Sequence, residues 1–336
     1  MFGENLLPPR ITLILLSSLC CVLIALTGRM YFNARAGILG AFIWAIYPTA
    51  ILSWYSSDRL LTEGLGIFFL LASFYFLAKL FRQYSLKGII MSSLLLGLAI
   101  LTRGYLALIL PLVVGFIFFF GHEKRFKTAF LYGLITTFVL GIWVARNYFV
   151  MGKAILSTQT DSFYWGNNEY ARGSMYGDVF TLEPWTAPQV QKLVQKYPGI
   201  KDYSEVQLSE VWMREGFGYL KEHPKRALWL FGRKTAIYLL PTQFWSVGIY
   251  KINYFYLLLL PVTFFVFWRV KNKKEYFLIL LPFIGVWISS LLTFSIDRYR
   301  FTVEPFIIII GSFGLLEFIS VIKLKFLSAK EKNDLK

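Results

Sequence analysis

The stretch TAFLYGLITTFVLGIWVA, residues 128–145, decides the fold class of this chain. It contains no charged side chain and has about the length that an α-helix needs to cross the hydrocarbon core of a bilayer. Arg146 and Asn147 follow it directly, so the apolar run ends abruptly. Because lipid offers no partner for backbone polar groups, we predict a transmembrane helix here.

Eight further apolar runs accompany this one along the chain. A single run is also typical of a buried helix in a soluble protein, but nine in one chain are not. We therefore predict an all-α polytopic membrane protein with about nine transmembrane helices. The predicted spans are residues 11–28, 38–55, 65–78, 88–102, 104–121, 128–145, 252–268, 276–294 and 303–322.

The composition supports this class and raises a question about charge. Of 336 residues, 57% are hydrophobic and 16% are charged, against roughly 25% charged in a typical soluble domain. These values exclude a disordered chain and an ordinary soluble enzyme. The formal net charge of +16 is also typical of nucleic-acid-binding proteins, so the positions of the basic residues decide between the two interpretations.

The basic residues gather in alternate connections between the spans and in the C-terminal tail. The other short segments hold only Arg10, Arg59, Arg103, Arg298 and Arg300. By the positive-inside rule the basic side is cytoplasmic, so most of the net charge reports topology and no nucleic-acid partner is predicted. The basic residues on this side are Arg29, Arg35, Lys79, Arg82, Lys87, Lys124, Arg125, Lys127, Arg269, Lys271, Lys273, Lys274, Lys323, Lys325, Lys330, Lys332 and Lys336.

This topology divides the chain into three parts. Residues 1–145 form an N-terminal bundle of about six spans, and residues 146–250 form a small, mainly helical extracytoplasmic segment. Residues 251–336 form a C-terminal bundle of about three spans and a basic cytoplasmic tail. In the middle segment, Ser204-Glu-Val-Gln207 predicts a capping box at the start of a helix.

Residues 227–240 are apolar but contain Arg233 and Lys234. If this stretch crossed the membrane alone, the basic loop around Lys271 would fall on the wrong side. We therefore predict an interfacial or re-entrant helix on the external face. A crossing paired with a second, unassigned crossing stays an alternative.

Polar residues at the external helix ends are expensive to place and are therefore functional candidates. Asp58 and Glu63 stand before the third span, where a carboxylate could act as a general base toward an acceptor hydroxyl. The competing interpretation is a carboxylate that stabilises a helix N-terminus. Arg103 lies between two spans, where its guanidinium could hold a phosphate or simply extend to the interface.

Two further sets complete the candidate site. Asp297-Arg-Tyr-Arg300 is a dense charged cluster before the last span, and Lys234 adds another cation. Arg146 and Asn147, followed by an aromatic loop with Asn167 and Asn168, suit sugar binding, although an aromatic interfacial belt has a similar composition. No His/Cys cluster has metal-ligand spacing, so neither a metal site nor a cofactor is predicted; dependence on a divalent metal stays open.

Several of these stretches resemble a known family. GIWVARNY (141–148) with Gly152, then YWGNN (164–168) with Gly173, is similar to its "PW-x-x-RN…GNN…G" pattern. RYRFTVEP (298–305) is similar to its "RYR-x-P-x-x-P" entry to a late helix, and His223-Pro224 with Arg233-Lys234 to its "HP…K" segment. Leu61-Thr-Glu63 and Leu101-Thr-Arg103 resemble its "TE" and "L-x-R" positions. Across about residues 30–310 the chain thus resembles the integral-membrane GT-C glycosyltransferases, which include the protein O-mannosyltransferases and the bacterial aminoarabinose transferase for lipid A.

The resemblance implies a reaction and a location. Such enzymes transfer a sugar from a polyprenyl-phosphate donor to a protein, lipid or glycan acceptor at the outer face of a membrane, here a plasma membrane that is expected to be a bacterial inner membrane. It implies membrane lipid as a partner and gives Asp58 and Glu63 the catalytic carboxylate positions. The positions expected to bind phosphate or substrate are Arg103, Arg146, Asn147, Asn167, Asn168, Lys234, Arg298, Tyr299 and Arg300.

The chain departs from the family pattern at its start. The family's first span precedes an external loop with the principal catalytic aspartate, whereas here the segment before the first predicted span holds only Glu4 as an acid. A truncated gene model, a misassigned start codon or a remnant without this acid would each produce that pattern. Two other functions therefore stay open: a transporter of polyprenyl-linked substrate, and a non-catalytic subunit of a glycan assembly pathway.

Overall fold

The fold is known from a computed structural model. It is nearly all helical, as the sequence predicts, with one short pair of strands. Asp58 and the end of the second predicted span lie outside the residues that the structure describes. Those are residues 7–50, 62–121, 124–174, 185, 187–240, 242–246, 249–271 and 273–334.

Within the described residues, nine apolar helices overlap the nine predicted spans. Five of them are long and apolar enough to cross a membrane; four shorter ones accompany them, so the number of full crossings stays a prediction. A 3₁₀ turn, η1 (Gly104–Leu108), leads directly into α6. The nine are α1 (Leu7–Tyr31), α2 (Ala34–Ala45), α4 (Glu63–Arg82), α5 (Leu86–Thr102), α6 (Ile109–Phe120), α7 (Arg125–Met151), α12 (Tyr254–Arg269), α13 (Lys273–Leu292) and α15 (Glu304–Asp334).

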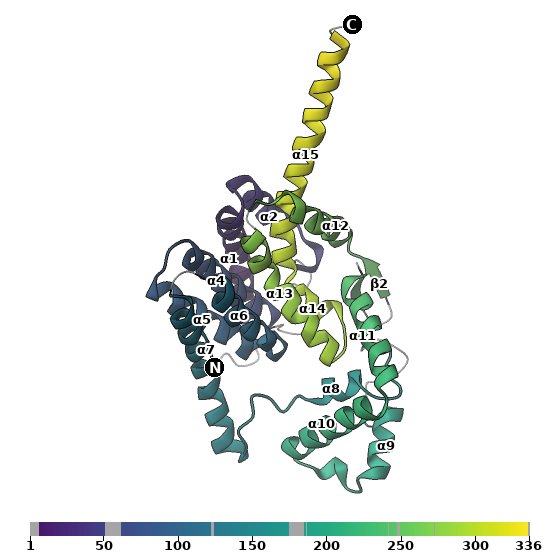
Figure 1. The fold of residues 1–336 in the computed structure, drawn as a ribbon. Helices are drawn as coiled ribbons and strands as arrows, with labels where there is room; N and C mark the ends of the chain where they lie inside the picture. The colour runs from purple at the N-terminus through teal and green to yellow at the C-terminus, as the bar shows by residue number, and fades with distance from the viewer. Residues whose placement is uncertain are drawn as a thin grey trace.

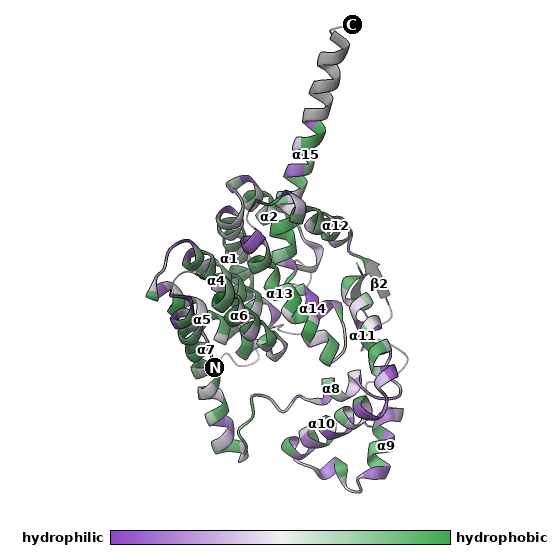
Figure 2. Cartoon of the chain, in the orientation of Figure 1, coloured by the Kyte–Doolittle hydropathy of each residue, from purple (hydrophilic) through white to green (hydrophobic). Residues whose placement is uncertain are grey.

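These helices share one core and expose apolar faces around it. The first turns of α15 are almost completely buried, and Phe306 packs edge to face on Phe74 of α4 with 5.1 Å between ring centroids. The α7 helix instead exposes Phe130, Leu134 and Phe138, which recur at every fourth position on one face. A continuous apolar outer face is what lipid requires, and Figure 2 shows apolar residues over most of the bundle.

The helix connections rich in Lys and Arg lie at one end of this bundle. Arg82, the last residue of α4, donates to the carbonyl of Met30 near the end of α1. The Nζ atom of Lys124, just before α7, lies 4.9 Å from the ring centre of Tyr84 between α4 and α5. We call this the basic end. The residues proposed for the site lie at the other end, which we call the site end.

A small helical unit is attached at the site end. Three helices and a 3₁₀ turn surround a minor core, and a fourth helix, α11, leads back to the bundle; Figure 1 shows α8–α10 at the opposite end of the molecule from the C-terminus of α15. The capping box predicted at Ser204 is confirmed, because Ser204 and Gln207 bond reciprocally at the helix start. The elements are α8 (Asp161–Gly166), α9 (Pro188–Lys196), η3 (Ile200–Asp202), α10 (Glu205–Glu222) and α11 (Pro224–Leu239).

The α11 helix runs beside α13 rather than across the end of the bundle. Lys234 Nζ donates to the carbonyl of Leu291 at 2.9 Å, while Tyr238 Oη, one turn further on, donates to the carbonyl of Phe283 at 2.9 Å. The contacted residue on α13 thus changes from Leu291 to Phe283, eight residues nearer the start of that helix and roughly 12 Å along its axis. The placement of residues 227–240 as an interfacial or re-entrant helix, or as one of a pair of crossings, stays a prediction.

A two-stranded antiparallel ribbon separates α11 from α12, and the all-α expectation missed it. Strands β1 (Thr242–Ser246) and β2 (Ile249–Ile252) pair Thr242 with Ile252 and Phe244 with Tyr250. Their aromatic and β-branched residues suit strands. These two strands are too short to be distinguished from the adjacent apolar helix by the sequence pattern alone. The chain therefore forms α11, then this ribbon, and then α12.

Glycines allow a close helix contact between α1 and α2. A Cβ atom on Gly37 would overlap the carbonyl oxygen of Ala25, and one on Gly28 would lie 2.6 Å from the Cα of Gly37. Small residues of this kind permit close approach of membrane helices.

The substitution Gly37→Ala is therefore expected to separate α1 from α2 and to destabilise the protein by about 1–3 kcal/mol, the usual cost of overpacking. Thermal unfolding of the purified protein in detergent measures this. Gly115→Ala in α6 is the matched control, because a Cβ there meets no atom within 4 Å. Equal melting temperatures for the two variants would contradict the close-packing explanation.

Candidate functional site

Three of the predicted residues meet at the site end. Glu63 is the first residue of α4, and its carboxylate contacts the guanidinium groups of Arg103 and Arg298. Arg103 joins α5 to η1, and Arg298 lies in α14 (Asp297–Phe301), a short helix between α13 and α15. The sequence thus brings one carboxylate and two cations together from three separate helix ends.

The exposure of this cluster is uneven. The Glu63 side chain is 2% exposed, whereas the Arg103 and Arg298 side chains are 23% and 44% exposed. The three side chains therefore carry one buried negative charge and two positive charges, which lie on partly exposed guanidinium groups. Such an arrangement favours an anion as ligand, and guanidinium groups bind phosphate well through their fork geometry.

Aromatic rings hold the two arginine-bearing elements together. Tyr299 packs on Tyr105 of η1 with 4.3 Å between ring centroids, and on its other side stacks with Phe294 at 5.6 Å. Ser289 Oγ donates to the carbonyl of Tyr105 at 2.5 Å, which ties η1 to α13. Tyr299 was predicted in the site, and its described neighbours give it a packing contact beside the Glu63 cluster.

Arg300 has different surroundings from Arg298, two residues earlier on the same helix. The Arg300 side chain is 1% exposed and that of Glu304 is 2% exposed. Arg300 Nε donates to Glu304 Oε1 at 2.8 Å. Its Nη1 donates to the carbonyl of Tyr238 at 3.0 Å and to that of Leu240. Tyr238 lies in the last turn of α11 and Leu240 directly follows the helix, where no helical N–H is left to bond their carbonyls.

The same buried pair reaches α2 and α12. Tyr47 Oη, just after α2, donates to Glu304 Oε2 at 2.8 Å. Asn253 Nδ2 donates to Tyr47 Oη at 2.7 Å, while Asn253 Oδ1 caps the start of α12. The Arg300 guanidinium also lies 4.0 Å from the ring centre of Tyr256. Arg300 and Glu304 therefore join α2, α11, α12, α14 and α15.

Lys234 forms a second junction, with the predicted GNN loop. It is fully buried, and its Nζ donates to Asn167 Oδ1 and to the carbonyl of Leu291, each at 2.9 Å. Asn167 Nδ2 donates to the carbonyl of Leu292 at 2.6 Å. A Cβ on Gly166 would overlap the carbonyl oxygen of Thr293, so only glycine permits this approach. Burial lowers the pKa of Lys234 to about 7.

The remaining predicted amides bond to nearby backbone. Asn168 Nδ2 donates to the carbonyl of Tyr164 at 2.9 Å, and Asn147 Nδ2 donates to that of Ile155 at 2.8 Å. Arg146 Nη1 donates to Asn147 Oδ1 at 3.0 Å, and its guanidinium lies over the Trp143 ring. These contacts hold the end of α7 and the loop after α8 in shape. A role in sugar binding stays a prediction.

The candidate residues therefore fall into separate groups. The Glu63 cluster unites Glu63, Arg103 and Arg298, with Tyr299 beside it; Lys234 and Asn167 form another group, and Arg300 a third. Sequence reasoning did not select Tyr105, Tyr47 or Asn253, whose partners are distant in sequence. Glu304 lies in the VEP stretch quoted above. Its position four residues after Arg300 was the feature of the sequence that could have predicted their ion pair. Among the described residues, no group of three or more His, Cys, Asp or Glu could hold a metal ion.

Substitutions at Arg300 and Glu304 test how the buried pair works. Arg300→Met and Glu304→Leu each leave an uncompensated buried charge, so each is expected to destabilise the protein by about 3–5 kcal/mol. The double variant removes both charges and is expected to cost less than the sum of the two. Chemical unfolding in detergent measures the cycle; strictly additive losses would show that the two side chains act independently.

Lys234 predicts a specific pH dependence of stability. Its pKa is about 7 in the folded protein against 10.5 in an unfolded chain, so between these values the unfolded chain binds more protons. Burial of the charged Lys234 side chain therefore destabilises the folded protein most below pH 7. The free energy of unfolding is expected to rise as the pH increases from about 7 toward 10. The rise should vanish in Lys234→Met and persist in Lys225→Met, an exposed lysine of the same helix. A thermal-unfolding series against pH decides, and a profile unchanged in Lys234→Met would contradict it.

Comparison with known proteins gives these groups a context. Residues 1–146 match the family model described as dolichyl-phosphate-mannose-protein mannosyltransferase; the match includes Glu63 and Arg103 but ends before Arg298. No curated protein and no solved structure was found to match the chain. With its apolar helices, this match identifies an integral, multi-pass membrane protein. Over residues 1–146, the chain is therefore similar to the dolichyl-phosphate-mannose-protein mannosyltransferase family.

Proposed function

We propose that this protein transfers a sugar from a polyprenyl-phosphate donor to a protein, lipid or glycan acceptor at the outer face of the membrane. One observation carries the proposal: Glu63 lies between Arg103 and Arg298, whose guanidinium groups are partly exposed at the site end. The family match over residues 1–146 supports the same reaction class.

The reaction needs stabilisation of its leaving group. The bond between the anomeric carbon and the phosphate oxygen breaks, and the phosphate leaves with the bonding electrons. The acceptor oxygen forms the new bond and gives up its proton to a base. Arg103 and Arg298 are proposed to hold the phosphate and stabilise its charge as it leaves.

Glu63 has two roles to weigh within this proposal. Both of its carboxylate oxygens already contact guanidinium groups, which supports a role in positioning Arg103 and Arg298. As a general base it would first have to release one of them. Asp58, five residues earlier, is the other candidate base, and it lies outside the described residues.

The other candidates are proposed to support the Glu63 cluster. Arg300 fixes α14, the helix that carries Arg298, through contacts with protein groups. Lys234 and Asn167 fix the end of α13, from which the chain continues to α14. Arg146, Asn147 and Asn168 stay candidates for contacts with the sugar or the acceptor.

Sugar transfer from a polyprenyl-phosphate donor is expected to fall on the order of 100-fold in Arg298→Ala and in Arg103→Ala, the cost of removing one preorganised donor. Arg298→Lys keeps the charge but loses the fork and is expected to fall between Arg298→Ala and the wild type. Glu63→Gln should also lose activity, because the two guanidinium groups lose their shared anion.

The matched control is Lys192→Ala, which removes an exposed cation that pairs with Glu169 in the small helical unit. This variant should keep wild-type activity. Wild-type rates in both Arg103→Ala and Arg298→Ala would contradict the proposed phosphate site. Donor binding without transfer in the wild type would instead favour a non-catalytic subunit, and uptake of the donor into vesicles without transfer would favour a transporter.

The proposed topology places the site end outside and the basic end in the cytoplasm. In a Cys20→Ala/Cys21→Ala background, Lys225→Cys in α11 should react with a membrane-impermeant maleimide added to intact cells. Lys271→Cys, between α12 and α13, should react only after the membrane is opened. Both lysines are exposed, so access alone sets the result. The reverse labelling pattern would overturn the orientation.

A further inference from the structure

Two arginines and a tryptophan form a cluster on α11, outside the three groups of candidate residues described above. The Arg226 guanidinium lies 3.9 Å from the centre of the Trp229 ring, and the Arg233 guanidinium lies 5.6 Å from the centre of the same ring. The three residues follow one another at intervals of three and four positions, so they share one side of the helix. We call them the Trp229 cluster.

The loop after α8 holds both guanidinium groups of this cluster. Arg226 Nη2 donates to the carbonyl of Ala171 at 3.1 Å, and Arg233 Nε donates to that of Arg172 at 2.7 Å. Gly173 follows with a φ of +89°, and a Cβ there would lie 3.3 Å from Arg233 Cγ, so glycine suits this close approach of loop and helix. The arginines are therefore positioned in advance, which lowers the entropy cost of binding a ligand.

Neither guanidinium of the Trp229 cluster has a carboxylate partner among the residues that the structure describes, whereas Arg103, Arg298 and Arg300 each contact an acid. A guanidinium has five N–H donors, so each one keeps donors beyond its contact with the loop. The predicted topology places this part of α11 outside, where the positive-inside rule does not account for basic residues. Two cations held on one ring without a counter-ion favour an anion as ligand.

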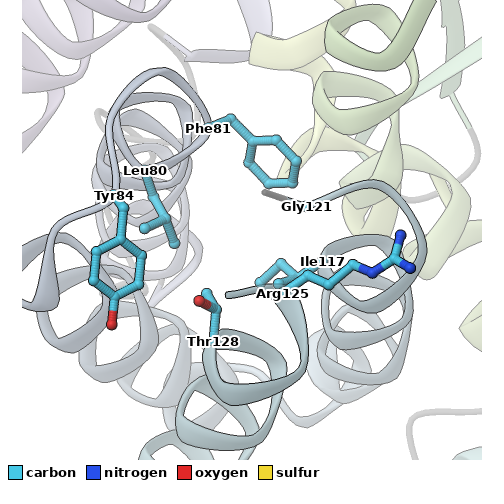
Figure 3. Close-up of a pocket in the computed structure, with 7 residues that line it drawn as sticks. All are labelled: Leu80, Phe81, Tyr84, Ile117, Gly121, Arg125 and Thr128. Atoms are coloured by element: carbon cyan, nitrogen blue, oxygen red, sulfur yellow. The ribbon is translucent and has the colours of Figure 1, made fainter. Parts of the chain in front are cut away.

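Arg125 at the basic end has a different arrangement. Figure 3 shows a small pocket between α4, α6 and the start of α7, and the Arg125 guanidinium points away from it. That guanidinium donates to the carbonyl of Phe119 at 3.2 Å, while the neighbouring Lys124 lies over the Tyr84 ring. These two cations have separate contacts, and the positive-inside rule accounts for their presence.

The surface below the Trp229 cluster becomes apolar along α11. Trp229, Arg233, Ala236 and Leu240 are exposed, and their spacing of four, three and four residues makes one stripe. Lys234, next to Arg233, bonds to Leu291, the penultimate residue of α13, so Arg233 lies near the level where that predicted span ends. Tryptophan and arginine are typical of the headgroup level, and an apolar stripe beyond them suits acyl chains.

We propose that the Trp229 cluster binds the headgroup of one anionic phospholipid of the outer leaflet. The phosphate is held by the guanidinium groups of Arg226 and Arg233, and an acyl chain follows the stripe toward Leu240. The choice of leaflet rests on the proposed topology, whereas the binding itself requires no sugar transfer. Its failure and the failure of the proposed function are therefore distinguishable.

Native mass spectrometry of the full-length protein in detergent, with added dioctanoyl phosphatidylglycerol, measures the affinity for the first bound lipid. The wild type is expected to bind phosphatidylglycerol much more tightly than dioctanoyl phosphatidylcholine. Arg226→Gln and Arg233→Gln each remove one cation and should weaken phosphatidylglycerol binding about fivefold, the usual contribution of one basic residue near an anionic lipid surface.

The matched control for these variants is Arg214→Gln in α10. The Arg214 guanidinium also lies near an aromatic ring, 5.0 Å from the centre of Tyr197, but it has Glu215 beside it at 4.0 Å. This variant should bind phosphatidylglycerol as the wild type does. Equal weakening in Arg214→Gln would show a general attraction between basic residues and anionic lipid and would overturn a specific site.

Gly232→Glu tests the same surface without removing a contact of either arginine. A Cβ at Gly232 meets no atom within 4 Å, so the new side chain has room beside Trp229. Its carboxylate should compete with the lipid phosphate and weaken binding at least about fivefold relative to Gly232→Gln, which has the same size and no charge.

Three results would overturn the proposal. They are equal affinities in Gly232→Glu and Gly232→Gln, wild-type affinity in both Arg226→Gln and Arg233→Gln, and equal binding of phosphatidylcholine and phosphatidylglycerol. Displacement of the lipid by inorganic phosphate at a matched concentration would assign the cluster to a soluble anion and would also overturn it.

Discussion

The ion pair between Arg300 and Glu304 is the contact on which the rest of the site end depends. Both side chains are almost wholly buried, and they form further hydrogen bonds with Tyr238, Leu240 and Tyr47. A buried pair of charges is stable only when such partners are complete. The pair thereby fixes where α11 stops, where α15 begins and how α14 is presented, and α14 carries the arginine that meets Glu63.

Sequence and structure agree best where the signal is local. The apolar runs of α4, α13 and α15 predicted their helices because hydropathy alone requires them, and the capping box at Ser204 needs only four residues. Glu63, Arg103 and Arg298 were identified because each interrupts apolar sequence at a helix end. The residues of the candidate site therefore stand out in the sequence as charged residues that interrupt the membrane pattern.

What the sequence did not reveal depends on distance along the chain. Glu63 meets Arg298 across 235 residues and Tyr47 meets Glu304 across 257, and no spacing rule connects such positions. The course of α11 was ambiguous because Arg233 and Lys234 interrupt an apolar run. The structure shows that Lys234 is bonded to Leu291 of α13 and to Asn167, which directly follows α8. A charged residue that interrupts an apolar run can be found in the sequence. The distant residue that it contacts can be identified only from the structure.

The break between α11 and α12 also constrains how the chain is assembled. The carbonyls of Tyr238 and Leu240 end their helix without an amide partner and receive one from Arg300, which the ribosome adds about sixty residues later. Until that arginine arrives, the end of α11 needs water for these groups. The end of α11 can therefore complete its packing only after Arg300 and the rest of α14 have been synthesised.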